Sequence, residues 1–246
     1  MEAFATAHVF ACSEIGTSTD RVFSHNRANS VQRRGASLPP RNERVVMNTA
    51  KWSRDLLSRA GFRFHVRPVG PGDEAALGEF FTHVTPDDLR FRFLSSVNVV
   101  SHGQLSAMIT VDHRQKENFL AFDSDGTTII ATAMVACDPA LTVGEVAISI
   151  RPDFKGRGVS WELLEHVARF AEELGVATLQ SIESNDNHSA IELEREMGFT
   201  ARSYPGDATL TLVERKLPLP ATVWPRTPIS RRTAGVPSVL KETLHD

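Results

Sequence analysis

The spacing of hydrophobic residues predicts alternating strands and helices between residues 61 and 217. Apolar and polar residues alternate over 62–68, as in a strand with one buried face. Apolar residues then recur at helical spacing over 73–84. Thr85-Pro86 and the Ser101/Gln104 pair are helix-start signatures. Further predicted helices cover 86–94, 101–111, 159–174 and 189–197, and further strands cover 118–122, 128–137, 143–150, 176–183, 199–204 and 209–216. The order predicts one mixed α/β domain.

The two ends of the chain lack such a pattern. Residues 1–60 are expected to be a poorly ordered basic extension in which 47–60 forms a short helix, and translation from Met47 is an alternative. Residues 218–246 carry repeated prolines and are expected to be a loose tail. The predicted domain therefore spans 61–217.

Composition narrows the class of protein. The chain has 27 Lys and Arg against 30 Asp and Glu, and the net charge of −3 argues against a nucleic-acid partner. No apolar run approaches the roughly 18–20 residues of a membrane span. Two cysteines, Cys12 and Cys137, are too few for a disulfide scaffold, and no His, Cys or Asp grouping has metal-site spacing. We therefore expect a soluble cytoplasmic protein without a metal or a membrane partner.

Charge is distributed unevenly. Residues 61–217 hold 14 basic and 23 acidic side chains, a net charge of −9, whereas both ends are basic. An acidic domain favours a cationic partner.

One loop stands out chemically. Lys155-Gly156-Arg157-Gly158-Val159-Ser160 follows a predicted strand and opens a predicted helix. Glycine allows close backbone approach, and the free amides of a helix N-terminus favour an anion. The loop therefore predicts a pyrophosphate cradle, with a tight solvated turn as the alternative. Neither the Walker pattern nor a dinucleotide fingerprint is present.

This segment resembles motif A of the GNAT acetyltransferases, Gln/Arg-x-x-Gly-x-Gly/Ala, with Lys155 and Ser160 as departures. A second GNAT signature is similar to residues 187–199, where Asn187 and Ala190 precede a helix that ends in Gly198-Phe199. The resemblance covers about residues 63–216. It implies a GNAT fold: a mixed sheet of six to seven strands, about four helices, and acetyl-CoA bound where 143–150 splays from 176–183.

The resemblance also implies which residues bind the donor. Pantetheine is expected along the first strand of that cleft, with backbone amides near Ile148 polarising the thioester carbonyl. The expected cofactor-binding residues are Ile148, Ser149, Ile150, Lys155, Gly156, Arg157, Gly158, Val159, Ser160 and Asn187.

A narrower resemblance concerns the acceptor. Residues 66–94 and the segment LSAMITVDH look like the catalytic domain of Pat-type bacterial protein lysine acetyltransferases. This implies acetyl transfer to a protein lysine. A small amine such as a polyamine, amino acid or antibiotic is an alternative acceptor, and a non-catalytic acyl-CoA sensor is an alternative function.

Glu145 occupies the position of the GNAT general base. A lysine amine has a pKa of about 10.4 and must lose a proton before it attacks a thioester. The alternative is a solvated carboxylate at a strand end. Many GNATs carry a Tyr proton donor where this chain has Glu194. No general acid is assigned here, since a thiolate with a pKa near 8.5 can take its proton from water.

The remaining candidates are weaker. Asp112, His113 and Arg114 could touch the acceptor, although a loop salt bridge is the simpler reading. His188 could contact CoA or face solvent, and Cys137 is expected to pack in the core.

Overall fold

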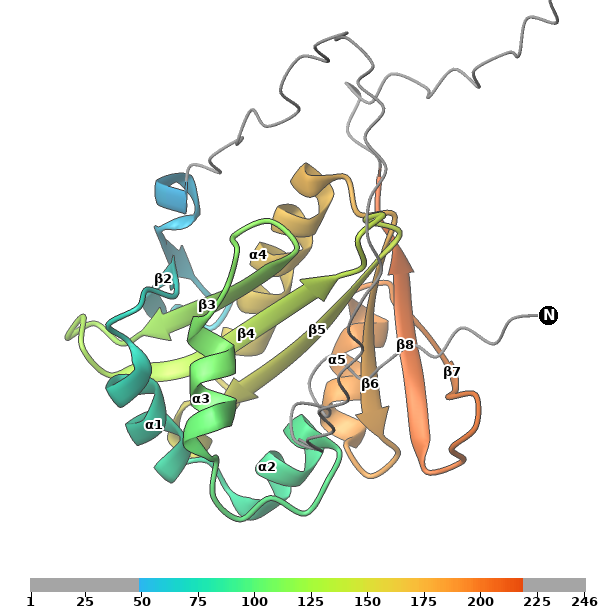
Figure 1. The fold of residues 1–246 in the computed structure, drawn as a ribbon, viewed down its shortest axis with the longest axis horizontal. Helices are drawn as coiled ribbons and strands as arrows, with labels where there is room; N and C mark the ends of the chain where they lie inside the picture. The colour runs from blue at the N-terminus through green and yellow to red at the C-terminus, as the bar shows by residue number, and fades with distance from the viewer. Residues whose placement is uncertain (1–48, 219–246) are drawn as a thin grey trace, which may run out of the picture.

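A computed structural model describes residues 49–218 and shows an eight-stranded sheet flanked by helices (Figure 1). The strand order is β1-β2-β3-β4-β5-β6-β8-β7. All neighbouring strands are antiparallel except β5 and β6, which are parallel. The strands are β1 (Arg54–Leu57), β2 (Arg63–Pro68), β3 (Lys116–Phe122), β4 (Ile129–Cys137), β5 (Val143–Ile150), β6 (Thr178–Ser184), β7 (Thr200–Ser203) and β8 (Leu210–Lys216).

Five α-helices and two 3-10 helices complete the described part of the chain. Thr85 and Ser101 cap two of them as predicted, and Ser101 forms the reciprocal capping box with Gln104. Gly175 ends the longest helix in the left-handed conformation (φ 82°). The helices are η1 (Thr49–Trp52), α1 (Glu74–Thr82), α2 (Pro86–Phe93), α3 (His102–Ile109), η2 (Pro152–Phe154), α4 (Val159–Leu174) and α5 (His188–Glu196).

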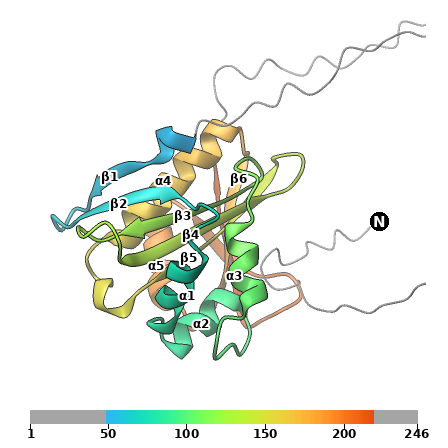
Figure 2. The same cartoon turned by 60° about the vertical axis from the view of Figure 1, so that its left-hand side comes forward.

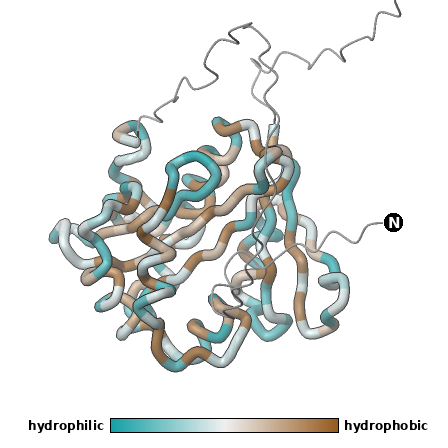
Figure 3. The backbone as a smooth tube through the Cα atoms, in the orientation of Figure 1, coloured by the Kyte–Doolittle hydropathy of each residue, from teal (hydrophilic) through white to brown (hydrophobic). Residues whose placement is uncertain are grey.

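The sheet is covered on both faces, as Figures 1 and 2 show. On β3, Phe119 points into a core shared with α4, whereas the next residue, Leu120, points into a second core under α1, α2 and α3. This alternation is the period of two expected of a strand buried on both sides. Hydrophobic residues accordingly concentrate on the central strands (Figure 3).

The predicted mixed α/β fold is confirmed, with eight strands rather than six to seven and five α-helices rather than about four. The extra strand is β1, in the segment for which a short helix was predicted. There η1 forms only four residues, and β1 then pairs with β2. Trp52 explains the difference, because its ring lies buried 5.2 Å from that of Phe170 on α4 and draws this segment onto the sheet.

Residues 1–48 and 219–246 lie outside the described residues. The predictions of a loose extension and a Pro-rich tail concern these residues and stay predictions. Among residues 49–218, no helix is long and apolar enough to cross a membrane.

Candidate active site

A cavity of about 530 Å³ lies where β5 and β6 diverge. Its size is within the range of small-molecule sites, about 300–1,000 Å³. Side chains of α2, α4 and α5 complete its walls, and Arg59 reaches it from the β1–β2 turn. The lining therefore comes from four separate stretches of the chain, namely residue 59 and residues 88–94, 145–164 and 182–194.

The divergence of β5 and β6 has a clear register. The two strands pair at Val143↔Thr178, Gly144↔Leu179 and Glu145↔Gln180, and no further. Beyond Glu145, β5 stays paired with β4 as far as Ile150. The edge of β5 that faces β6 therefore presents backbone polar groups to the cavity, and these need partners from a ligand or water.

The predicted cradle closes the cavity at the start of α4. Gly156 and Gly158 both have left-handed backbone conformations, with φ of 73° and 81°. Gly158 is the N-cap of α4 and offers no side-chain cap, so the first amides of the helix remain open to an anion. A Cβ atom on Gly158 would lie 3.0 Å from the Cβ of Ser58, which shows how closely the β1–β2 turn approaches the cradle.

The cations around the cradle differ from the expectation. Lys155 lines the cavity, but its Nζ lies 2.6 and 2.7 Å from the two carboxylate oxygens of Asp88 on α2. The Arg157 guanidinium lies over the rings of Phe154 and Phe62, at 4.7 and 5.2 Å from their centroids. Arg157 is absent from the cavity lining, so its guanidinium points to the aromatic surface instead.

Arg59 is a cavity cation that the sequence did not indicate. Its guanidinium lies 4.0 Å from the ring centroid of Trp161, and both residues line the cavity. This stacking fixes the arginine beside the cradle. The only signal in the sequence was the basic charge of residues 47–60.

Of the other predicted donor-binding residues, most line the cavity. Val159 does not, because its side chain is buried in the core between α4 and the sheet. Asn187 lines the cavity and donates from Nδ2 to Glu183 Oε2 at 2.7 Å. The predicted residues in the lining are Glu145, Ile148, Ser149, Ile150, Lys155, Gly156, Gly158, Ser160 and Asn187.

Glu145 lies at the fork of the two strands and is 8% exposed. Arg92 on α2 lies nearby and is 6% exposed. Burial lowers the pKa of Arg92 to about 10, whereas the negative charges of Glu145 and Glu183 act to raise it. The cavity thus holds one buried guanidinium between carboxylates of β5 and β6.

Two further carboxyl groups were not predicted as site residues. Burial raises the pKa of Glu183 to about 7, opposed by the Asn187 amide and by Arg92. Burial also raises the pKa of Glu194 on α5 to about 8, and the charge of Glu183 adds to this shift. Ser181 Oγ donates to Glu194 Oε1 at 2.5 Å. Both carboxyl groups thus have raised pKa values inside a cavity, which is typical of functional sites.

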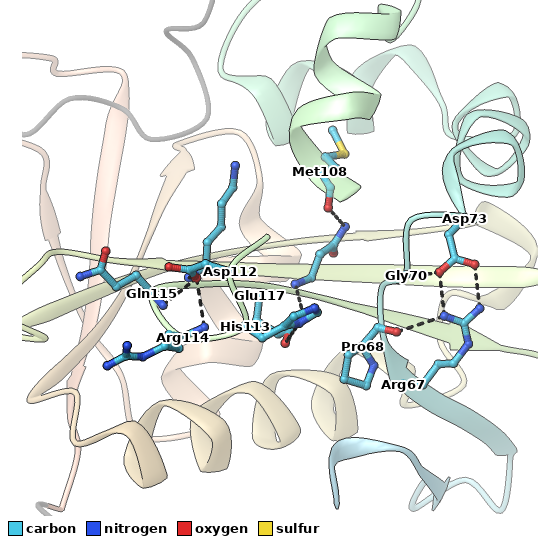
Figure 4. A network of polar contacts seen from close by, with 12 residues as sticks. Arg67, Pro68, Gly70, Asp73, Met108, Asp112, His113, Arg114, Gln115 and Glu117 are labelled. Carbon is cyan, nitrogen blue, oxygen red and sulfur yellow. Dashed lines mark hydrogen bonds and ion pairs between the residues drawn. The ribbon is translucent and has the colours of Figure 1, made fainter. Parts of the chain in front are cut away.

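The weaker candidates lie away from the cavity. Asp112 Oδ1 accepts hydrogen bonds from the backbone amides of Arg114, Gln115 and Lys116, and His113 Nδ1 lies 2.8 Å from Glu117 Oε2 (Figure 4). This arrangement organises the turn before β3 and gives these residues a local structural role.

Cys137 lies at the end of β4, where burial raises the pKa of its thiol to about 12. A thiol of this kind is a poor nucleophile. Among residues 49–218, no group of three or more His, Cys, Asp or Glu side chains is placed to hold a metal ion.

Comparisons with known proteins agree with this geometry. Residues 86–199 match the model of the Acetyltransferase (GNAT) family. Acetyltransferase PA5475 of Pseudomonas aeruginosa is 24% identical over 148 residues, which cover 58% of this chain and 78% of that protein. The GNAT domain of S. lividans PAT superposes with a TM-score of 0.64 and 25% identity, over 68% of this chain and 98% of that domain. The ribosomal-protein-S5-alanine acetyltransferase of Vibrio fischeri shares the fold, with a TM-score of 0.54 and 12% identity over 67% of this chain and 96% of that one.

Proposed function

We propose that this chain, which contains a GNAT acetyltransferase domain and so transfers acetyl from acetyl-CoA to an amine, acts on a protein lysine that Glu145 deprotonates. The observation that carries the proposal is the position of Glu145. It is the last β5 residue paired with β6, it lines the cavity, and it is 8% exposed. A carboxylate at this fork can reach an amine that attacks a thioester held along the open edge of β5.

The donor site follows from the same geometry. The open edge of β5 at Ala147–Ile150 offers hydrogen bonds to the amide groups of pantetheine. The open amides after Gly158 offer an anion site for the pyrophosphate. Arg59 supplies a fixed positive charge beside these amides. Lys155 supplies a second positive charge, which the carboxylate of Asp88 partly neutralises.

The acceptor is inferred from charge and likeness. The net charge of −9 over residues 61–217 attracts a cation such as a protonated lysine. The likeness to the S. lividans PAT domain agrees with the narrower resemblance to Pat-type enzymes and supports a protein acceptor. Glu145 accepts the proton from the lysine ammonium, directly or through water, and the neutral amine then attacks the acetyl carbon.

Release of CoA by the purified protein tests this function. The acceptors to compare are a lysine peptide, intact lysine-containing proteins, a polyamine, a free amino acid and an aminoglycoside. We expect the lysine acceptors to have the highest kcat/KM. Glu145→Gln should lower kcat by about 10²–10⁴-fold. The control Glu196→Gln changes an exposed carboxylate on α5 and should leave kcat unchanged.

Two results would contradict the proposal. A higher kcat/KM for a small amine than for every lysine acceptor would refute the choice of acceptor. Between about pH 6 and 9 a lysine amine, with a pKa of about 10.4, is mostly protonated and needs a base. A Glu145→Gln variant with wild-type kcat over this range would refute the role of Glu145. Mass-spectrometric comparison of the acetylated proteome with and without the protein then identifies the modified lysines.

A further inference from the structure

Glu194 is a buried cavity residue that the proposed function leaves without a role. It lies on α5, lines the cavity, and is 5% exposed. Its Oε1 accepts a hydrogen bond of 2.5 Å from Ser181 Oγ. Its Oε2 is also buried, and within residues 49–218 it has no hydrogen-bond partner. A buried polar atom that lines a cavity and lacks a partner points to a group of the ligand.

The surroundings of Glu194 favour its neutral form. Burial disfavours the carboxylate, and the negative charge of Glu183 on β6 disfavours it further. The cation of the cavity, Arg92 on α2, acts on Glu183 and on Glu145 of β5. Arg92 favours the ionised form of Glu183, whereas burial and the charge of Glu183 favour the protonated form of Glu194. The other acids of α5, Glu192 and Glu196, are exposed to solvent.

Acetyl transfer requires two proton transfers in opposite directions. The attacking nitrogen must lose a proton, and the departing sulfur gains one. In the tetrahedral intermediate, nitrogen and sulfur are separate substituents of the same carbon. A carboxylate that accepts the proton of the nitrogen is therefore poorly placed to protonate the sulfur. The cavity offers a carboxylate on its β5 wall, Glu145, and a carboxyl group on its α5 wall, Glu194.

We propose that Glu194 is a catalytic residue that donates the proton of its buried carboxyl group to the thiolate of CoA as the C–S bond breaks. This role rests on the proposed function. The amine nitrogen forms a bond to the acetyl carbon, the electron pair of the C–S bond leaves on sulfur, and sulfur takes the Glu194 proton. The products are the N-acetyl amine and CoA thiol. The Glu194 carboxylate then takes up a proton from solvent. Glu145 releases to solvent the proton that it accepted from the amine. Ser181 is a positioning residue that holds the acid through Oε1.

The protonation state of the Glu194 carboxyl group can be measured without turnover. Infrared spectra of the full chain at pH 7 should contain a protonated-carboxyl C=O band that Glu194→Gln removes and Glu192→Gln retains. The band should titrate away as the pH rises past neutrality. Absence of this difference means that Glu194 is ionised at pH 7, and the proposal is overturned whatever the acceptor is.

Kinetics then test the proton transfer itself, with any amine that the enzyme acetylates. Glu194→Gln should lower kcat by about 10–100-fold, with the KM for acetyl-CoA changed less than about twofold. In the wild type, kcat should fall at alkaline pH because Glu194 loses its proton. The Glu194→Gln variant should not show this fall. The matched control is Glu192→Gln, which alters an exposed carboxylate on the same helix and should keep the wild-type kcat and pH profile. Circular dichroism and calorimetric acetyl-CoA binding confirm that each variant is folded.

The outcomes separate this proposal from the proposed function. A protonated Glu194 with wild-type kcat and pH profile in Glu194→Gln would overturn the acid role and leave Glu145 and the lysine acceptor intact. Loss of the alkaline limb in Glu194→Gln, together with a small amine as the best acceptor, would support the acid role and refute the lysine acceptor.

Discussion

The packing of the β1–β2 turn against the donor cradle predicts that Gly158→Ala destabilises the protein and weakens acetyl-CoA binding. Gly158 has a φ of 81°, and an alanine in the left-handed region costs roughly 1–2 kcal/mol. The new Cβ would lie 3.0 Å from the Cβ of Ser58, a tight contact that Ser58 must relieve by shifting a few tenths of an ångström. Overpacking of this kind costs about 1–3 kcal/mol. We therefore expect a loss of about 2–5 kcal/mol.

Gly126→Ala isolates the backbone contribution. Gly126 has a φ of 70°, and a Cβ there would meet nothing within 4 Å, so only the left-handed cost applies. Urea unfolding followed by circular dichroism gives the free energy of unfolding of both variants, and calorimetry gives the Kd for acetyl-CoA. Gly158→Ala should lose more stability than Gly126→Ala and should alone raise the Kd, because the cradle amides shift with the helix start.

A double-mutant cycle with Ser58→Gly completes the test. Removing the Ser58 Cβ removes the steric contribution, so Gly158→Ala should cost less in the Ser58→Gly background. Equal losses for Gly158→Ala and Gly126→Ala, with no coupling to Ser58, would refute the reasoning.

Three further predictions concern the buried charges and the half-buried thiol of Cys137. Arg92→Met leaves the cavity carboxylates without their buried cation and should lower the free energy of unfolding, measured in urea, by about 3–5 kcal/mol. Arg90→Met removes a half-exposed arginine of the same helix and should cost less than about 0.5 kcal/mol. A loss below about 1 kcal/mol for Arg92→Met would contradict this expectation. Burial raises the folded-state pKa of Glu194 to about 8, so the native state binds more protons than the unfolded state between about pH 5 and 8. Stability should fall as pH rises through that window, and the fall should be smaller in Glu194→Gln than in Glu192→Gln; an equal fall in both variants would show that Glu194 titrates normally. In a Cys12→Ser background, Cys137 should resist alkylation at pH 8 until urea unfolds the chain, because burial raises its pKa to about 12; rapid labelling of the folded protein would show that the thiol is accessible.

Features encoded in neighbouring residues were predictable from the sequence. β5 and α4 have the predicted bounds, and the caps at Thr85 and Ser101 form as expected. These features depend on three local properties: the spacing of hydrophobic residues, hydrogen bonds from side chains to nearby backbone amides, and the conformational freedom of glycine at Gly158 and Gly175. The position of Glu145 in the strand and the placement of the 155–160 loop before α4 follow from the same local rules.

The tertiary structure alone decided which charges share the cavity. Lys155 pairs with Asp88, which lies 67 positions away in the sequence, and Arg59 enters from the turn after β1, an edge strand that no hydrophobic period indicated. Glu194 becomes a buried group only because α5 packs it against Ser181 of β6. Charge pairing and desolvation depend on distances between elements, whereas a sequence pattern reports only which residues share a face of one element. The sequence thus determined the strand, the loop and the candidate base, and the packing of α2, α5 and the β1–β2 turn decided the electrostatics around them.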